Sequence, residues 1–237
     1  MADEASHIGP MIPLDIVSDP ICPWCYIGKA HFDKAVEAKG AQPFDLFWRP
    51  FQLNPDMPKG GMNRKEYLER KFGPERAKSF YKQIEETAVA AGLDVRFDLI
   101  ETTPNTFDAH RVIRWARGSG KQTELVTELF IRYFTKGENI GDRDLLVDVA
   151  EGAGMERELV ARLLGGDADA EEVRQEEATA REIGVNGVPT FVIANKHVVT
   201  GAQPPALWET VLDEIAEQLA EADRAASSTA AGAGAAL

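Results

Sequence analysis

Two short apolar runs near the start of the chain predict β-strands. Residues 11–17 (MIPLDIV) and 44–48 (FDLFW) combine apolar and β-branched or aromatic residues, and each run is closed by a proline soon after it. Between them, apolar residues recur at helical spacing from Pro23 to about residue 38, and Gly40 follows as a helix stop. Strand, helix and strand in this order indicate the opening of an α/β unit.

The middle of the chain shows only the helical period. Asn63, with Glu66 three residues later, is typical of a capped helix start. The apolar stripes that follow lie at 109–116, 125–134, 145–149 and 159–164. We therefore expect an all-helical insertion over residues 63–184.

Strand signals return after this block. Residues 190–193 and 197–200 predict a hairpin, and the apolar stripe at 207–219 predicts a last amphipathic helix. The tail is built of Ala, Ser, Gly and Thr and is expected to be disordered. The expected organisation is an α/β core with its first half at 11–62, the insertion at 63–184, the second half at 185–223 and the disordered tail at 224–237.

Charge and hydropathy exclude some classes of function. The formal net charge is -13, so we expect neither nucleic acid nor an anionic membrane as a partner, since both need a basic surface. No run reaches the roughly 18 apolar residues of a membrane helix. The first residues are acidic, unlike a secretory signal, and the expected location is the cytoplasm.

The two cysteines of the chain carry its most specific chemical signal. Cys22 and Cys25 lie three apart, and Pro23 suits the first position of the predicted helix. Residues at that spacing bring their Cβ atoms within about 5–6 Å, which permits a disulfide. Unpaired N–H groups at a helix N-terminus favour the thiolate of Cys22. The pattern predicts Cys22 as the attacking thiolate and Cys25 as the resolving thiol.

Two other interpretations of the pair are open. A zinc site needs four ligands, and the four histidines (7, 31, 110 and 197) are scattered without a second close pair. Two inert, buried cysteines are also conceivable, although a helix-starting pair directly after a strand is a poor match for them.

A family resemblance adds to this reading. The Cys22-Pro23-Trp24-Cys25 segment, together with Val188-Pro189-Thr190, resembles the active site of the thioredoxin superfamily. The runs 18–28, 49–55 and 105–111 are similar to DsbA-like oxidoreductases, and within them to the FrnE group. The resemblance extends over about residues 11–222. It implies a thioredoxin fold and a cis Val188–Pro189 bond facing the cysteines.

The same resemblance implies a function and its participants. Substrate is expected along a groove between core and insertion, in contact with Pro23, Trp24, Val188, Pro189 and Thr190. The expected partners are proteins or small molecules with thiols or disulfides. No cofactor is expected beyond the redox-active disulfide, with glutathione as an optional co-substrate. Substrate identity, net direction and oligomeric state do not follow from the sequence.

Departures from the family pattern keep alternatives open. Well-known DsbA proteins have a His between the cysteines, whereas Trp24 stands here, which weakens the case for a strong oxidant. Asn54 and the 105–110 stretch also resemble 2-hydroxychromene-2-carboxylate isomerases and kappa-class glutathione transferases. Those usually have a serine where Cys22 stands, so two cysteines favour redox chemistry over the alternative, a glutathione-dependent isomerase or transferase. A third class is a non-catalytic binding or chaperone module.

Two further residues have open roles. Asp15, inside the first predicted strand, is either a buried proton acceptor for Cys25 or a solvent-facing edge residue. His110, on a predicted helix, is either a structural hydrogen-bonding residue or part of the groove.

Overall fold

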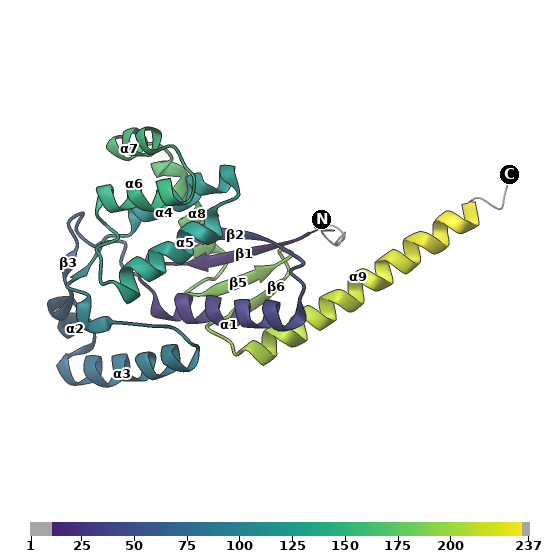
Figure 1. The fold of residues 1–237 in the computed structure, drawn as a ribbon, viewed down its shortest axis with the longest axis horizontal. Coiled ribbons are helices and arrows are strands. Elements are labelled where there is room, and N and C mark those ends of the chain that lie inside the picture. Colours follow the sequence, from purple (N-terminus) through teal and green to yellow (C-terminus); the bar gives the residue numbers. More distant parts are fainter. Residues whose placement is uncertain (1–10, 234–237) are drawn as a thin grey trace, which may run out of the picture.

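The computed structural model describes residues 11–233, and its centre is a four-stranded sheet in the order β2-β1-β5-β6 (Figure 1). Strand β1 (Ile12–Ser18) pairs in parallel with β2 (Phe44–Pro50). Strand β5 (Thr190–Ile193) runs antiparallel to β1, and β6 (His197–Thr200) runs antiparallel to β5. These pairings confirm the predicted α/β class and the thioredoxin arrangement of the sheet.

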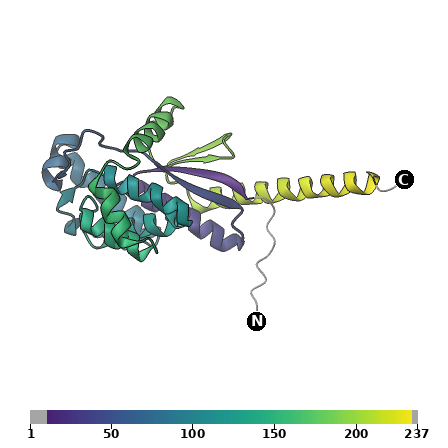
Figure 2. The same cartoon turned by 90° about the horizontal axis from the view of Figure 1, so that it is seen from above.

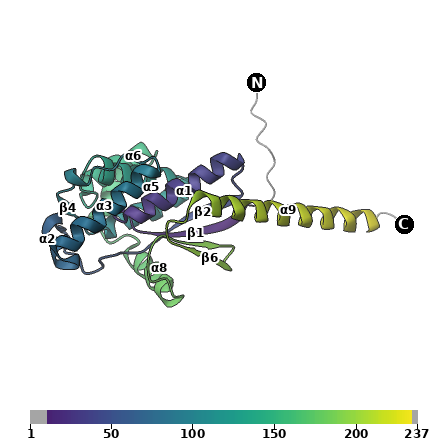
Figure 3. The same ribbon diagram turned by 90° about the horizontal axis from the view of Figure 1, so that it is seen from below.

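Helices cover both faces of this sheet. Helix α1 (Pro23–Lys39) and the start of α9 (Pro205–Ala233) lie on one face, and α8 (Ala170–Glu182) lies on the other (Figure 3). Helix α8 falls inside the stretch expected as insertion, yet it packs on the sheet, where Ala180 joins the same buried cluster as Val17. Its helical period identifies a helix but not the surface that the helix covers, so the sequence could not separate α8 from the insertion.

The remaining helices form the insertion on one side of the core. They are α2 (Arg64–Phe72), α3 (Pro74–Ala90), α4 (Phe107–Ala116), α5 (Gln122–Phe130), α6 (Arg143–Gly152) and α7 (Arg157–Gly165). A small two-stranded sheet, β3 (Met62–Asn63) with β4 (Thr102–Thr103), interrupts the helices. Strands of two residues are too short to show an alternating pattern, so the expectation of helices alone missed them.

Aromatic side chains of the core pack against aromatic side chains of the insertion. Tyr26 of α1 stacks on Phe130 and Phe134, whose ring centroids lie 5.1 and 5.8 Å away. Near the middle of α1, Phe32 meets Trp208 of α9 edge to face, with ring centroids 5.1 Å apart. The first turns of α1, which carry the cysteines, are therefore held against the insertion.

The chain end differs from expectation. The tail was expected to be disordered from residue 224, but α9 continues to Ala233 and extends past the sheet (Figure 2). Alanine has the highest helix propensity, so an Ala-rich segment can continue a helix that has already begun. Residues 234–237 lie outside the described part of the chain. Within residues 11–233, no helix is both long and apolar enough to cross a bilayer.

Candidate dithiol site

Cys22 and Cys25 lie at the first turn of α1. Cys22 is the N-cap residue, Pro23 is the first residue of the helix, and the Cys25 backbone N–H donates to the Cys22 carbonyl at 3.0 Å. The Cys22 backbone N–H is turned back and donates to the Asp19 carbonyl at 2.9 Å. Both residues are free thiols, with only 3% and 1% of Cys22 and Cys25 exposed. The predicted placement of the pair at the start of a helix is confirmed.

The loop before β5 lies against Cys22. The Cys22 Sγ donates to the Val188 carbonyl at 3.5 Å, and the Val188–Pro189 peptide bond is cis. A Cβ atom at Gly28 would lie 3.0 Å from Pro189 Cγ, so glycine there lets the loop approach α1 closely. The structure thus brings together two segments that are 166 residues apart in sequence.

The other predicted site residues divide into two kinds. Pro23 and Trp24 are half-buried beside Cys22, and their side chains keep part of their surface accessible. Thr190 is buried at the start of β5, and its hydroxyl donates to the Gly187 carbonyl at 2.8 Å. This hydrogen bond closes the loop on itself, so the Thr190 hydroxyl positions the loop.

Burial dominates the electrostatics of Cys25. Burial raises the pKa of the Cys25 thiol well above its ordinary value, and its hydrogen bond and charge interaction with Cys22 raise this pKa further. The Ser18 hydroxyl and the Asp19 backbone lower the pKa of Cys25, but less strongly than burial raises it. Cys25 is therefore held as the neutral thiol at neutral pH.

Asp19 organises the loop between β1 and α1. Its carboxylate is completely buried and accepts from the backbone N–H of Leu53 at 2.7 Å and of Ile21 at 3.4 Å. The His110 Nε2 lies 3.7 Å from the same carboxylate, and no hydrogen bond to this nitrogen is formed among the described residues. His110 is also buried, which agrees with a structural role. Asp19 thus connects the dithiol loop to the segment after β2 and to α4.

Asp19 was not singled out in the sequence analysis. The available signal was an Asp directly after a strand and before a proline, because Asp side chains hydrogen-bond nearby backbone N–H groups in such turns. The link to Leu53 crosses 34 residues and has no sequence signature.

Asp15 does not serve Cys25. Its Oδ1 accepts from the Arg49 Nε at 2.6 Å, and Arg49 also faces Glu176 of α8 at 3.8 Å. Asp15 therefore points to the face covered by α8, whereas Cys25 belongs to a helix on the other face. Of the two roles left open for Asp15, the proton acceptor for Cys25 is contradicted, because side chains alternate along a strand and Asp15 faces α8. The edge position is wrong as well, since β1 lies between β2 and β5.

A metal would need more ligands than the pair supplies. Within residues 11–233, no three His, Cys, Asp or Glu side chains gather in a metal-binding arrangement. The arrangement that these residues do form, two adjacent free thiols at a helix start, is suited to thiol–disulfide exchange.

Comparison with known proteins establishes the family. A sequence model of the DSBA-like thioredoxin domain matches residues 13–213. The chain belongs to the DsbA-like thioredoxin family. The resemblance to this family is thereby confirmed, and the structural neighbours of this DsbA-like chain are consistent with the FrnE group.

Individual relatives are similar over nearly the whole length. A probable DsbA oxidoreductase from Streptomyces coelicolor has a TM-score of 0.77 and 32% identity, covering 86% of this chain and 89% of that one. The uncharacterized protein YwbO of Bacillus subtilis is 26% identical over 204 residues, 86% of this chain and 96% of YwbO.

Two more distant structures show the same fold. The cytosolic disulfide reductase DsbM of Pseudomonas aeruginosa has a TM-score of 0.62 at 19% identity, over 87% of this chain and 99% of DsbM. A 2-hydroxychromene-2-carboxylate isomerase has a TM-score of 0.67 at 16% identity, over 88% of this chain and 98% of the isomerase. At these identities the likeness concerns the fold and not the reaction.

Proposed function

We propose that this DsbA-like protein is an enzyme that exchanges disulfides, with Cys22 as the nucleophile and Cys25 as the resolving thiol. The observation that carries the proposal is the asymmetry of the pair. Cys22 is the N-cap of α1 and contacts the Val188 carbonyl, while burial keeps Cys25 protonated. A helix N-terminus favours an anion at Cys22, and a protonated neighbour does not compete with it for the substrate.

The reaction proceeds by two exchanges. The Cys22 thiolate attacks one sulfur of a substrate disulfide, a Cys22–substrate disulfide forms, and the other substrate sulfur leaves as a thiolate that takes a proton from solvent. Cys25 then loses its proton and attacks the Cys22 sulfur, which releases the second substrate thiol. Two electrons pass from the dithiol to the substrate, and the reverse sequence oxidises a substrate dithiol.

The substrate contacts follow from what surrounds Cys22. In the proposal, Pro23 and Trp24 border the nucleophile on the helix side, and Val188, Pro189 and Thr190 form the loop side. A polypeptide or a small thiol held between these segments would place its sulfur against Cys22.

Glutathione is the proposed co-substrate, and the cytoplasm the proposed location. Support comes from DsbM, which is named as a cytosolic disulfide reductase and whose structure has also been solved with GSH. A glutathione-dependent isomerase or transferase is the alternative, because an isomerase shares this fold. The buried thiol of Cys25 beside Cys22 favours disulfide exchange, since an isomerase of that kind has no need of it.

The proposed function is tested with a small neutral disulfide. Hydroxyethyl disulfide is mixed with glutathione or dithiothreitol, and the release of mercaptoethanol is followed by chromatography with the native protein, with Cys22→Ala and with the exposed control Lys65→Ala. We expect catalysis by the native protein and the control and none by Cys22→Ala. The proposal would be overturned if the native protein did not accelerate disulfide reduction with either glutathione or dithiothreitol, for hydroxyethyl disulfide and for insulin as a second substrate.

A further inference from the structure

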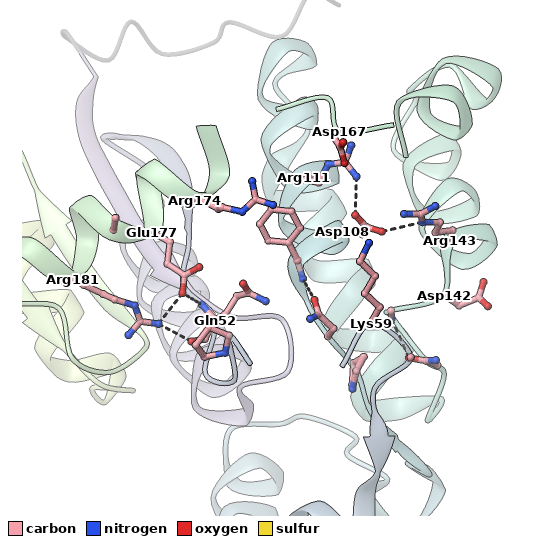
Figure 4. A pocket seen from close by; sticks show the side chains of 18 residues that line it. Gln52, Lys59, Asp108, Arg111, Asp142, Arg143, Asp167, Arg174, Glu177 and Arg181 are labelled. Carbon is pink, nitrogen blue, oxygen red and sulfur yellow. Dashed lines mark hydrogen bonds and ion pairs between the residues drawn. The ribbon is translucent and has the colours of Figure 1, made fainter. Parts of the chain in front are cut away.

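A cavity of about 980 Å³, whose lining includes neither Cys22 nor Cys25, lies against the segment after β2 (Figure 4). Its walls come from the segment after β2, from the start of α4 and α6, and from α8. Gln52 lines it, and the next residue, Leu53, donates to Asp19 behind the dithiol. Helix α4 turns Asp108 and Arg111 toward the cavity and His110 toward Asp19. The cavity and the dithiol therefore flank the same loop.

The charge of this wall is opposite to that of the chain. The chain has 26 basic and 39 acidic residues, whereas basic residues outnumber acidic ones around the cavity. The basic set is Lys59, Arg111, Arg143, Arg174 and Arg181, and the acidic set is Asp108, Asp142, Asp167 and Glu177. A concave wall with a local excess of cations concentrates anions.

Two of these carboxylates are already engaged. Asp108 accepts from Arg111 at 2.7 Å and from Arg143 at 3.0 Å, so two guanidinium groups share one carboxylate. Glu177 accepts from Arg181 at 2.7 Å and from the Gln52 backbone N–H at 2.9 Å. These carboxylates are paired with basic side chains of the same wall. Because the basic side chains outnumber the acidic ones, the wall keeps a net positive charge.

Three hydrogen-bond donors on the wall can donate to further partners. Lys59 is exposed and forms no ion pair within 4 Å among the described residues. Arg174, 60% exposed, lies over the Phe107 ring at 5.0 Å and has one long contact to Glu171 at 3.4 Å. The Gln52 amide is buried, with 5% of the residue exposed, and its Nε2 has no hydrogen-bond partner among the described residues. A buried amide nitrogen without an acceptor is destabilising, and a ligand oxygen would supply the missing hydrogen bond.

These donors surround one space. Figure 4 labels Arg174, which comes from α8, and Lys59, which comes from the segment after β2, among the side chains that line the cavity, with Gln52 near Glu177. A guanidinium, an ammonium and an amide N–H together match carboxylate oxygens, and hydrogen bonds to charged acceptors are about twice as strong as neutral ones.

We propose that this cavity binds acidic side chains of the peptide segment next to the substrate disulfide, which makes the protein selective for acidic substrates. The inference rests on the proposed function, because it assigns a substrate class to the same enzyme. An extended peptide advances about 3.3 Å per residue, so the proposal requires that residues a few positions from the attacked cysteine reach the cavity while Cys22 holds the sulfur. Without the local cations, a chain of net charge -13 would repel such a substrate.

The test compares two cyclic disulfide peptides that differ only in four flanking residues, Glu in one and Gln in the other. The kcat/KM of reduction is measured for the native protein, for Lys59→Gln/Arg174→Gln and for the control Lys65→Gln/Arg70→Gln. The control makes the same charge change on α2, away from this cavity. We expect the native protein and the control to prefer the Glu peptide by roughly tenfold, mainly through KM, and the cavity variant to prefer it by about twofold or less.

The outcomes separate the two proposals. If the native protein reduces hydroxyethyl disulfide but turns over the Glu and Gln peptides equally well, the acidic subsite is overturned and the proposed function stands. The same holds if the cavity variant keeps the preference for the Glu peptide. Loss of the preference in both double variants overturns the acidic subsite too, because the effect would then be one of net charge. Free glutarate that blocks Glu-peptide turnover as tightly as the peptide binds would assign the cavity to small anions instead. No turnover of any disulfide by the native protein overturns the proposed function itself.

Discussion

The two faces of the central sheet are made by alternate residues of the same strands, yet they differ in polarity. Under α1 and α9, Leu14 and Ile16 are almost completely buried, and Phe191 and Trp208 meet edge to face with centroids 4.7 Å apart. Under α8, by contrast, Asp15 forms an ion pair with Arg49 at a partly exposed position. The helix that carries the dithiol packs on the apolar face.

This difference explains the state of the resolving thiol. Cys25 lies on the apolar side of the sheet, and the burial that raises its pKa comes from that packing. Asp15, an acidic side chain on β1 itself, lies on the polar side and forms an ion pair with Arg49. Asp19, past the end of β1, is the acidic residue whose carboxylate bonds to the dithiol loop within residues 11–233.

The largest expected effect comes from the apolar face. Trp208 is fully buried against Phe32 and Phe191, so Trp208→Ala should lower the free energy of unfolding by about 3–5 kcal/mol. Urea unfolding measures this, with Val198→Ala on the exposed edge strand as the control, where a change within about 0.5 kcal/mol is expected. A loss below 1 kcal/mol for Trp208→Ala would contradict the assignment of the core to this face.

A smaller effect is expected at the dithiol loop. Asp19→Ala removes the acceptor for two backbone N–H groups and should cost about 1–3 kcal/mol together with a slower disulfide exchange. Asp19→Asn retains one oxygen that can accept from Leu53 and should lose less of both. Urea unfolding and hydroxyethyl disulfide turnover are measured on the same samples. Equal behaviour of Asp19→Ala and the native protein would remove Asp19 from the account of the site.

The reduced protein should lose stability in alkali because of Cys25. Its pKa is raised on folding, so above the ordinary thiol pKa of about 8.5 the unfolded chain releases this proton while the folded protein keeps it. The contribution is complete below pH 8.5 and declines as pH rises, by up to about 1.4 kcal/mol per pH unit.

The measurement is the difference in unfolding free energy between reduced native protein and Cys25→Ala from pH 7 to 10. Burial also raises the pKa values of Tyr26, Tyr81 and Tyr133, but these tyrosines are present in both proteins and cancel in the difference. The native protein should lose more stability than Cys25→Ala above pH 8.5. Parallel curves would show that Cys25 titrates alike in both states.

The smallest effect is expected on the polar face. Asp15 and Arg49 form a partly exposed ion pair, so Asp15→Ala should change the free energy of unfolding by less than about 1 kcal/mol. Hydroxyethyl disulfide turnover should stay at the native rate, since Asp15 faces α8. A fall in turnover as large as that of Asp19→Ala would restore Asp15 as a proton acceptor.

Much of the fold could be predicted from local patterns. The four main strands and α1 follow from apolar period and turn residues, and the cysteine pair was predictable because Pro23 marks the start of a helix. The contact between Cys22 and Val188 needed the family resemblance, because no local pattern connects residues so far apart.

The rest depends on packing in three dimensions. The alternation along β1 shows which residues share a face, but not that α1 covers the face of Leu14 while α8 covers that of Asp15. The reach of Asp19 to Leu53 and the gathering of Lys59 and Arg174 around one cavity are likewise properties of the folded chain.

The central claim, that Cys22 attacks and Cys25 resolves, is tested most directly by trapping. Cys22→Ala and Cys25→Ala are expressed in the native host, and adducts that vanish with dithiothreitol are counted on non-reducing gels. Cys25→Ala should accumulate mixed disulfides through Cys22, because the thiol that releases the substrate is missing, and Cys22→Ala should accumulate none. Equal trapping by both variants, or trapping by neither, would contradict the assignment of the two roles.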